Sequence, residues 1–186
     1  MARKKQYNEA EVIEKAMYLF WRNGYENTSV RMLEKEMGIN QFSIYASFGN
    51  KHGVFVASLK EYRKRNAVIF NKLKASNKGL EDIKQFFYDS IQKTNDLDYK
   101  GCLVTNTYNE FIESEDEEIK NQMIDFMASL KAIFIEKLKI DSTKNEETVL
   151  KQANYLLLAK HGLAAAARVN TKQEIEDYIE MTFKNI

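Results

Sequence analysis

The segment TSVRMLEKEMGINQFSIYASF, residues 28–48, decides the fold of this chain. Its apolar residues recur at helical spacing, which predicts a helix over about 29–36 with Thr28 as its N-cap. A glycine ends that helix, and Asn40 caps a second one over about 41–47. Two short helices joined by a tight turn form a helix-turn-helix, which places its second helix in the DNA major groove. The segment therefore predicts DNA binding.

The sequence on either side extends this motif with further helices. Residues 9–23 carry one apolar face, with Asn8 as a predicted N-cap and Gly24 as the stop. A longer apolar stripe predicts a helix over about 50–74. The helix-turn-helix thus lies between two helices that can cover it.

Charge separates the chain into a basic and an acidic part. Residues 1–65 hold 12 Lys and Arg against 7 Asp and Glu, a net charge of +5. Residues 66–186 hold 16 against 20, a net charge of −4, and the two sum to the overall +1. A partner that carries phosphates needs positive charge only where it is contacted, so the basic end fits a DNA-binding role.

Composition indicates an all-α protein. The chain has 186 residues, no proline, only seven glycines and 44% hydrophobic residues, which favours long helices over a turn-rich sheet. We expect residues 1–50 to form a three-helix DNA-binding domain, and residues 51–186 to form a six-helix body. The body helices beyond residue 75 are expected at about 79–94, 102–113, 116–139, 146–168 and 172–184.

Several classes of protein are not supported by the sequence. A single cysteine, Cys102, excludes an internal disulfide and suits the reducing cytoplasm. The longest apolar stretch, 153–169, is interrupted by Lys160 and His161, which predicts a buried helix and no membrane partner. With two histidines and one cysteine, we find no metal-ligand spacing, no catalytic triad and no cofactor motif, so we expect no enzyme.

The caps, glycines and aromatic residues of the first quarter of the chain resemble those of the TetR/AcrR family of transcriptional regulators. The resemblance implies a homodimeric regulator that binds a double-stranded DNA operator, most simply a repressor released by a small organic effector. Gly101-Cys102-Leu103 also looks like one branch of that family. The matching positions are Ala16, Phe20, Gly24-Tyr25, Thr28-Ser29-Val30, Leu33, Gly38-Ile39, Ile44-Tyr45, Phe48 and Lys51.

The resemblance implies roles for residues that face DNA. The residues matching Tyr45, Lys51 and the hydroxyl that caps the second helix, here Thr28, typically meet phosphates, and their donor groups suit that contact. The alternatives are packing of Tyr45 on the first helix and a solvated helix start at Lys51. The full predicted set is Thr28, Ser29, Arg31, Asn40, Gln41, Phe42, Ser43, Tyr45 and Lys51.

The predicted recognition helix departs from the family pattern. It contains no Lys or Arg, and Phe42 stands where glycine is frequent. Base reading would then fall to Gln41, Ser43 and Asn40, with Phe42 able to touch a thymine methyl. Glu34 replaces a usually small residue. Ahead of the first helix, residues 3–5 (Arg3, Lys4 and Lys5) form either an arm on the DNA or a disordered tail.

Aromatic and sulfur-containing residues recur at helical spacing in the body. They form either an ordinary core or, as the family implies, a pocket for a neutral or weakly polar effector. Regulation by a protein partner or by modification of Cys102, with no pocket ligand, is the alternative. The predicted pocket residues are Tyr62, Phe86, Cys102, Asn106, Met123, Phe126 and Met127.

A run of small residues, 162–167, allows another helix to approach closely. In the resembled family the last two helices form the four-helix bundle of the dimer, whereas close packing inside one chain is the alternative. The predicted dimer residues are Gly162, Ala165, Ala166, Ile175 and Ile179.

Overall fold

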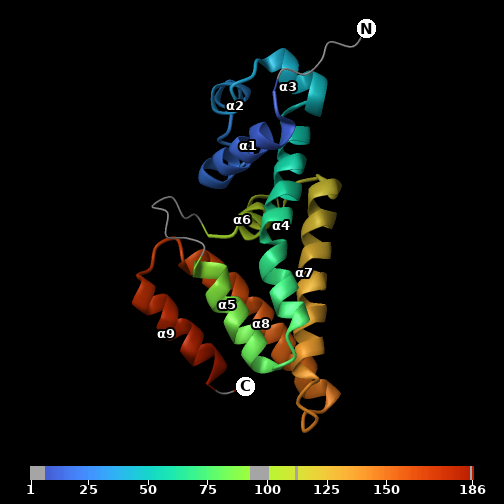
Figure 1. Cartoon of the computed structure of the whole chain (residues 1–186), viewed down its shortest axis with the longest axis vertical. Coiled ribbons are helices and arrows are strands. Elements are labelled where there is room, and N and C mark those ends of the chain that lie inside the picture. The colour runs from blue at the N-terminus through green and yellow to red at the C-terminus, as the bar shows by residue number, and fades with distance from the viewer. Residues whose placement is uncertain (1–6, 93–100, 112, 185) are drawn as a thin grey trace. The chain divides into compact units, whose positions relative to one another are not determined.

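The computed structural model describes residues 7–92, 101–111, 113–184 and 186. These residues form nine α-helices and no strand, which confirms the predicted all-α class (Figure 1). They divide into two compact units, and the division falls between Arg65 and Asn66, inside α4 (Lys51–Ala75). The first unit thus extends beyond the boundary predicted at residue 50. In the described part of the chain, no helix has the length and apolarity needed to cross a membrane.

The N-terminal unit consists of α1 (Glu9–Asn23), α2 (Val30–Met37), α3 (Gln41–Phe48) and the first turns of α4. The side chain of Asn8 caps α1, as predicted. The core of the N-terminal unit is formed by the apolar faces of these helices, whose buried residues recur at helical spacing. The most deeply buried are Ala16, Met17, Phe20, Leu33, Met37, Ile44, Val54, Phe55 and Leu59.

The prediction that Thr28 caps α2 is wrong by one residue. The cap is Ser29, whose hydroxyl oxygen accepts a hydrogen bond from the backbone N–H of Met32 at 3.2 Å. Thr28 is fully buried, and its hydroxyl donates to the carbonyl oxygen of Gly24 at 2.7 Å. That bond ties the end of α1 to the start of α2, so the exposed hydroxyl at the α2 N-terminus belongs to Ser29.

Aromatic rings join α1 to the first turns of α4. Phe20 and Phe55 make an edge contact at 4.8 Å between ring centroids, and Trp21 and Tyr62 do the same at 5.1 Å. Such pairs contribute about 1 kcal/mol each beyond the burial of their surface. Tyr62 therefore packs within the N-terminal unit, whereas the sequence assigned it to an effector pocket with residues of the other unit.

Gly53 marks the closest approach of α3 and α4. A Cβ atom at this position would overlap the carbonyl oxygen of Phe48, the last residue of α3. Because that obstacle is backbone, no side-chain rotation relieves it. Gly53 thus allows the two helices to meet at a tight corner.

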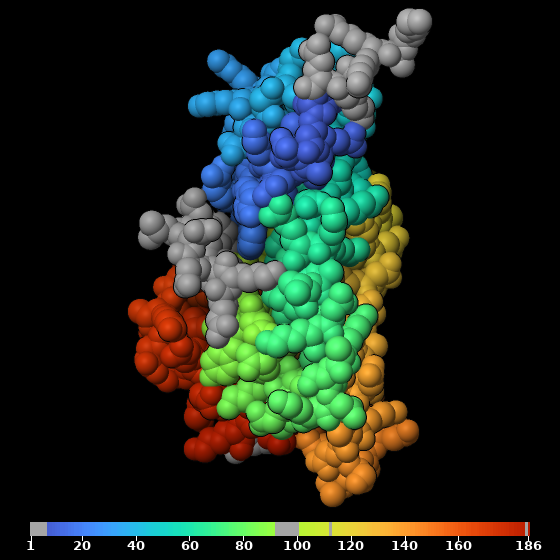
Figure 2. Space-filling view, in the orientation of Figure 1, coloured from blue at the N-terminus to red at the C-terminus, as the bar shows by residue number. Residues whose placement is uncertain are grey.

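The C-terminal unit contains α5 (Leu80–Gln92), α6 (Leu103–Phe111), α7 (Glu117–Leu138), α8 (Glu146–Ala166) and α9 (Lys172–Phe183). Helix α7 packs against α5, α6 and α8, and α9 packs against α5 and α8. Thr171 caps α9 as predicted, within a reciprocal capping box with Glu174. The connection between α7 and α8 projects from this unit (orange in Figure 2).

A buried lysine fixes the C-terminus of α4 in this unit. Lys137 on α7 is 2% exposed, and its ammonium donates to the carbonyl oxygens of Lys74 at 2.9 Å and Ser76 at 2.5 Å. The last carbonyls of a helix lack partners inside it. Lys137 supplies that missing donor from another helix.

Candidate functional site

The turn between α2 and α3 sets where α3 begins. Gly38 has the left-handed φ of 71°, and its N–H donates to the carbonyl oxygen of Glu34 at 3.0 Å. Two residues later, the side chain of Asn40 accepts a hydrogen bond from the N–H of Ser43 at 2.9 Å. The cap predicted at Asn40 is confirmed. The geometry is that of a helix-turn-helix, with α3 in the position of the recognition helix.

Glu34 gives α2 a second link to α3. Its carboxylate accepts a hydrogen bond from the backbone N–H of Gln41, the first residue of α3, at 2.5 Å. A negative charge at a helix N-terminus is stabilising, because the free N–H groups there carry partial positive charge. In the sequence Glu34 stands out only as a departure from a usually small residue, and no local pattern indicates this contact.

The N-terminal part of α3 presents its side chains to solvent. Phe42 is 83% exposed and Tyr45 is 41% exposed. The amide of Gln41 donates to the Tyr45 hydroxyl at 2.8 Å, so these two residues form one polar pair. Ser43 is half-buried beneath Tyr7, whose hydroxyl donates to its carbonyl oxygen at 3.3 Å. The structure therefore gathers four of the predicted DNA-facing residues on α3, one of them partly covered.

Two helix starts flank this surface within the same unit. Ser29 and Arg31 are exposed at the start of α2. Lys51 begins α4, and its ammonium lies 4.2 Å from the centroid of the Tyr25 ring. That cation–π contact restrains the ammonium group, so the Lys51 side chain would lose less conformational entropy on binding a phosphate. The predicted arm at residues 3–5 lies outside the described residues.

In the C-terminal unit, the predicted effector residues lie on α5, α6 and α7. Phe86 and Met123 are buried, and the ring of Phe70 contacts both Phe86 at 5.2 Å and Phe126 at 5.4 Å. Asn106 and Met127 are half-buried. The structure thus brings most of the predicted set into one unit, with Tyr62 as the exception.

Polar groups from α8 stand beside these aromatic rings. The ammonium of Lys160 lies 5.9 Å from the Phe86 ring centroid, and a ring nitrogen of His161 lies 2.8 Å from the sulfur of Met127. Burial lowers the pKa of Lys160, an effect that nearby Cys102 opposes. Burial, followed by the charge of Lys160, also lowers the pKa of His161. In the sequence, Lys160 and His161 stand out because they interrupt the apolar stretch 153–169.

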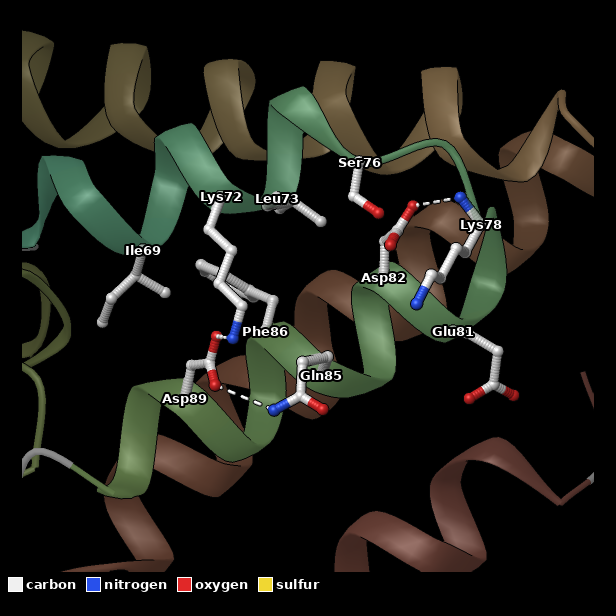
Figure 3. A pocket seen from close by; sticks show the side chains of 10 residues that line it. All are labelled: Ile69, Lys72, Leu73, Ser76, Lys78, Glu81, Asp82, Gln85, Phe86 and Asp89. Atoms are coloured by element: carbon white, nitrogen blue, oxygen red, sulfur yellow. Dashed lines mark hydrogen bonds and ion pairs between the residues drawn. The ribbon is translucent and has the colours of Figure 1, made fainter.

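A cavity of about 290 Å³ lies between α4 and α5 (Figure 3). Asp89 is paired there with Lys72 at 2.6 Å and with Gln85 at 2.8 Å. Asp82 accepts a hydrogen bond from the backbone N–H of Lys78 at 2.7 Å. These polar contacts are made within the unit itself, and only Phe86 belongs to the predicted pocket. The lining residues are Ile69, Lys72, Leu73, Ser76, Lys78, Glu81, Asp82, Gln85, Phe86 and Asp89.

The sequence predicts Ile175 and Ile179 at a dimer interface, whereas the structure buries both side chains within their own unit. They are 5% and 0% exposed and belong to the hydrophobic core of their own unit. Ala166 also packs partly against that core. The apolar spacing of Ile175 and Ile179 correctly indicates a buried face of α9, and this face packs against α8 and α5 of the same chain.

Other residues of α8 and α9 carry the exposed apolar surface. Gly162 and Ala165 are exposed, as an interface requires. Gly162 also lies against Tyr178, so close packing inside the chain explains it as well. Sequence reasoning missed the larger side chains, and Figure 2 shows α9, in red, at the surface. The large exposed apolar residues of these two helices are Leu150 (46%), Tyr155 (49%), Leu158 (70%), Tyr178 (37%) and Met181 (60%), and Val169 (86%) lies between the helices.

Within the described ranges, no group of three or more His, Cys, Asp or Glu side chains is arranged to hold a metal ion.

Comparison with known proteins identifies what this chain is similar to. Residues 12–57 match the family model described as bacterial regulatory proteins, tetR family. An uncharacterized HTH-type transcriptional regulator, YezE of Bacillus subtilis, is 30% identical over 119 residues, which are 63% of this chain and 61% of that protein. The HTH-type transcriptional repressor ComR of Escherichia coli is 36% identical over 85 residues, 43% of this chain and 40% of its own. The chain thus matches less than two thirds of the length of either relative.

Solved structures extend the similarity of fold to the whole chain. The TetR family transcriptional regulator CifR, as a cysteine mutant complexed with 26-bp double-strand operator DNA, has a TM-score of 0.86 at 20% identity and covers 99% of both chains. SCO4454, a TetR-family transcriptional regulator from Streptomyces coelicolor, has a TM-score of 0.81 at 13% identity, covering 95% of this chain and 88% of its own. The nine helices therefore follow a fold that such regulators adopt.

Proposed function

We propose that this chain, whose residues 12–57 match the family model of tetR bacterial regulatory proteins, is a DNA-binding transcriptional repressor of the cytoplasm. The observation that supports this most is the exposed surface of α3, flanked by the starts of α2 and α4. Ser29, Tyr45 and Lys51 offer hydroxyl and ammonium groups to phosphates, which fix the register of a protein on DNA. Gln41 and Phe42 stand at the N-terminal end of α3, the part of a recognition helix that meets base edges. The relatives are named as regulators, in agreement with the expectation that the chain is not an enzyme.

The functional form in this proposal is a homodimer. Two copies paired through the exposed apolar side chains of α8 and α9 would present two recognition helices to successive major grooves, about 34–36 Å apart. Leu158 and Met181, at 70% and 60% exposed, supply apolar surface that a second copy would cover. A two-fold axis places identical patches against each other.

Replacement of Lys51 by Ala should weaken binding to every duplex alike, because a phosphate contact carries no sequence information. The slope of log affinity against log salt should become shallower by about one unit for each subunit of the dimer, since each lost contact releases one counterion fewer. Fluorescence anisotropy with a labelled duplex at several salt concentrations measures both quantities. Lys60→Ala, an exposed lysine further along α4, is the matched control. Equal slopes for the Lys51 variant and the wild type would contradict the assigned contact.

The proposed regulation is release from DNA by a small organic effector that binds among α5, α6 and α7. The aromatic rings of Phe86 and Phe126 supply apolar surface, and half-buried Asn106 offers an amide that can orient a ligand. A ligand lowers operator affinity only to the extent that it prefers the conformation that binds DNA poorly.

Asn106→Trp should abolish the response to such an effector and leave DNA binding unchanged, because the larger ring fills the space the ligand needs. A library of neutral and weakly polar compounds, screened for a rise in melting temperature and for DNA release, provides the probes. Asn109→Trp, on the exposed side of α6, is the matched control and should respond like the wild type.

The same screen on Cys102→Ala separates the alternative mechanism. That alternative is control through the half-buried thiol of Cys102. If every active compound loses its effect in Cys102→Ala and keeps it in Asn106→Trp, modification of the thiol replaces the pocket as the mechanism.

A further inference from the structure

Phe42 is the most exposed aromatic residue in the described part of the chain. Its side chain is 83% exposed, against at most 49% for any tyrosine there. It is the second residue of α3, and the core contact of this helix is made by Ile44, which is fully buried. The fold of the N-terminal unit therefore makes little use of the Phe42 ring.

The polar residues next to Phe42 make hydrogen bonds within the protein. The amide of Gln41 donates to the hydroxyl of Tyr45, and the backbone N–H of Gln41 donates to the Glu34 carboxylate. The side chain of Asn40 accepts from the N–H of Ser43. Helix α3 contains no Lys or Arg, the residues that most often read guanine. An apolar ring is thus the most accessible group that this helix end offers to a base.

Only one apolar group is available in the major groove of unmodified DNA. The other base edges present hydrogen-bond donors and acceptors, whereas thymine presents its C5-methyl group. Residues at the N-terminal end of a recognition helix are the ones that reach base edges. We infer that Phe42 contacts a thymine C5-methyl group in each half-site, so that the operator carries a T·A pair at that position. This inference rests on the proposed function, and it names part of the sequence that the protein recognises.

Selection from a random duplex pool tests the inference with wild-type protein and with Phe42→Ala. The substitution removes an exposed ring and should leave the melting temperature unchanged. The wild type should enrich thymine at one position in each half-site. Phe42→Ala should lose that preference alone and retain the preferences at the other positions.

Uracil scanning of the selected duplex isolates the methyl group, because uracil keeps every hydrogen-bonding group of thymine. Replacing the critical thymine should weaken wild-type binding about fourfold for each half-site, the value expected for one buried methyl group. Phe42→Ala should bind the thymine and uracil duplexes equally, whereas Phe42→Leu should retain part of the discrimination.

Two outcomes overturn the inference and are distinct from each other. If the wild type selects a defined sequence, but Phe42→Ala keeps the same thymine preference or loses as much affinity as the wild type when uracil replaces thymine, then Phe42 does not read the base. If the wild type enriches no sequence at all, the proposed function itself fails, and the inference fails with it.

Discussion

Leu158→Glu should convert the protein into monomers and lower operator affinity by about 10²- to 10⁴-fold. Leu158 is 70% exposed on α8, so the change adds a charge without opening a cavity in the unit. Across a two-fold axis it would place two carboxylates in an apolar contact. Loss of the dimer removes the gain from binding two half-sites at once, which is typically of this size. Sedimentation measures the mass, and anisotropy with an operator duplex measures the affinity.

Ile124→Glu is the matched control for this variant. Ile124 is 59% exposed on α7, and the change is chemically equivalent but lies on another helix. It should leave both mass and affinity unchanged, and circular dichroism should report the same helicity for both variants. A wild-type chain that sediments as a monomer at micromolar concentration would rule out the proposed interface.

Lys137→Ala should cause a large loss of stability. This change leaves the carbonyl oxygens of Lys74 and Ser76 without their buried donor and removes a packed aliphatic stem. An unsatisfied buried acceptor costs about 1–3 kcal/mol, so we expect the free energy of unfolding to fall by about 3 kcal/mol. The melting temperature should fall by roughly 6–12 °C.

A second variant at this position separates the loss of the donor from the loss of packing, and a variant at a neighbouring lysine is the control. Lys137→Met keeps most of the stem and removes the donor, so it should show much of the same loss. Lys139→Ala, at an exposed residue just past α7, should change the melting temperature little. Equal melting temperatures for Lys137→Ala and Lys139→Ala would show that the two hydrogen bonds contribute nothing to stability.

Features set by local sequence were predictable. The caps at Asn8, Asn40 and Thr171 depend on residues three positions away or less, and each was placed correctly. The adjacent hydroxyls Thr28 and Ser29 were not distinguished, because both suit an N-cap. What separates them is a tertiary bond from Thr28 to the Gly24 carbonyl, which the pattern of α2 does not contain.

Features that depend on a distant partner were not predictable. The apolar face of α9 was visible, but periodicity does not say whether Ile175 and Ile179 meet their own core or a second chain. Lys137 donates to carbonyl oxygens more than 60 positions earlier in the sequence, so the residues next to Lys137 give no indication of the contact. The candidate DNA surface was easier to predict because it lies within a short continuous segment. The contact between the Glu34 carboxylate and the backbone N–H of Gln41 was not predicted.

The corner at Gly53 determines how motion passes to the DNA-facing surface. Repulsion between atoms rises steeply once they touch, and packed protein interiors are nearly incompressible. With the backbone of α4 already in contact with the last carbonyl of α3, the first turn of α4 has no free travel before it displaces α3. Movement of that turn toward α3 is therefore resisted by backbone contact, and any side chain at this position would have to displace the recognition helix.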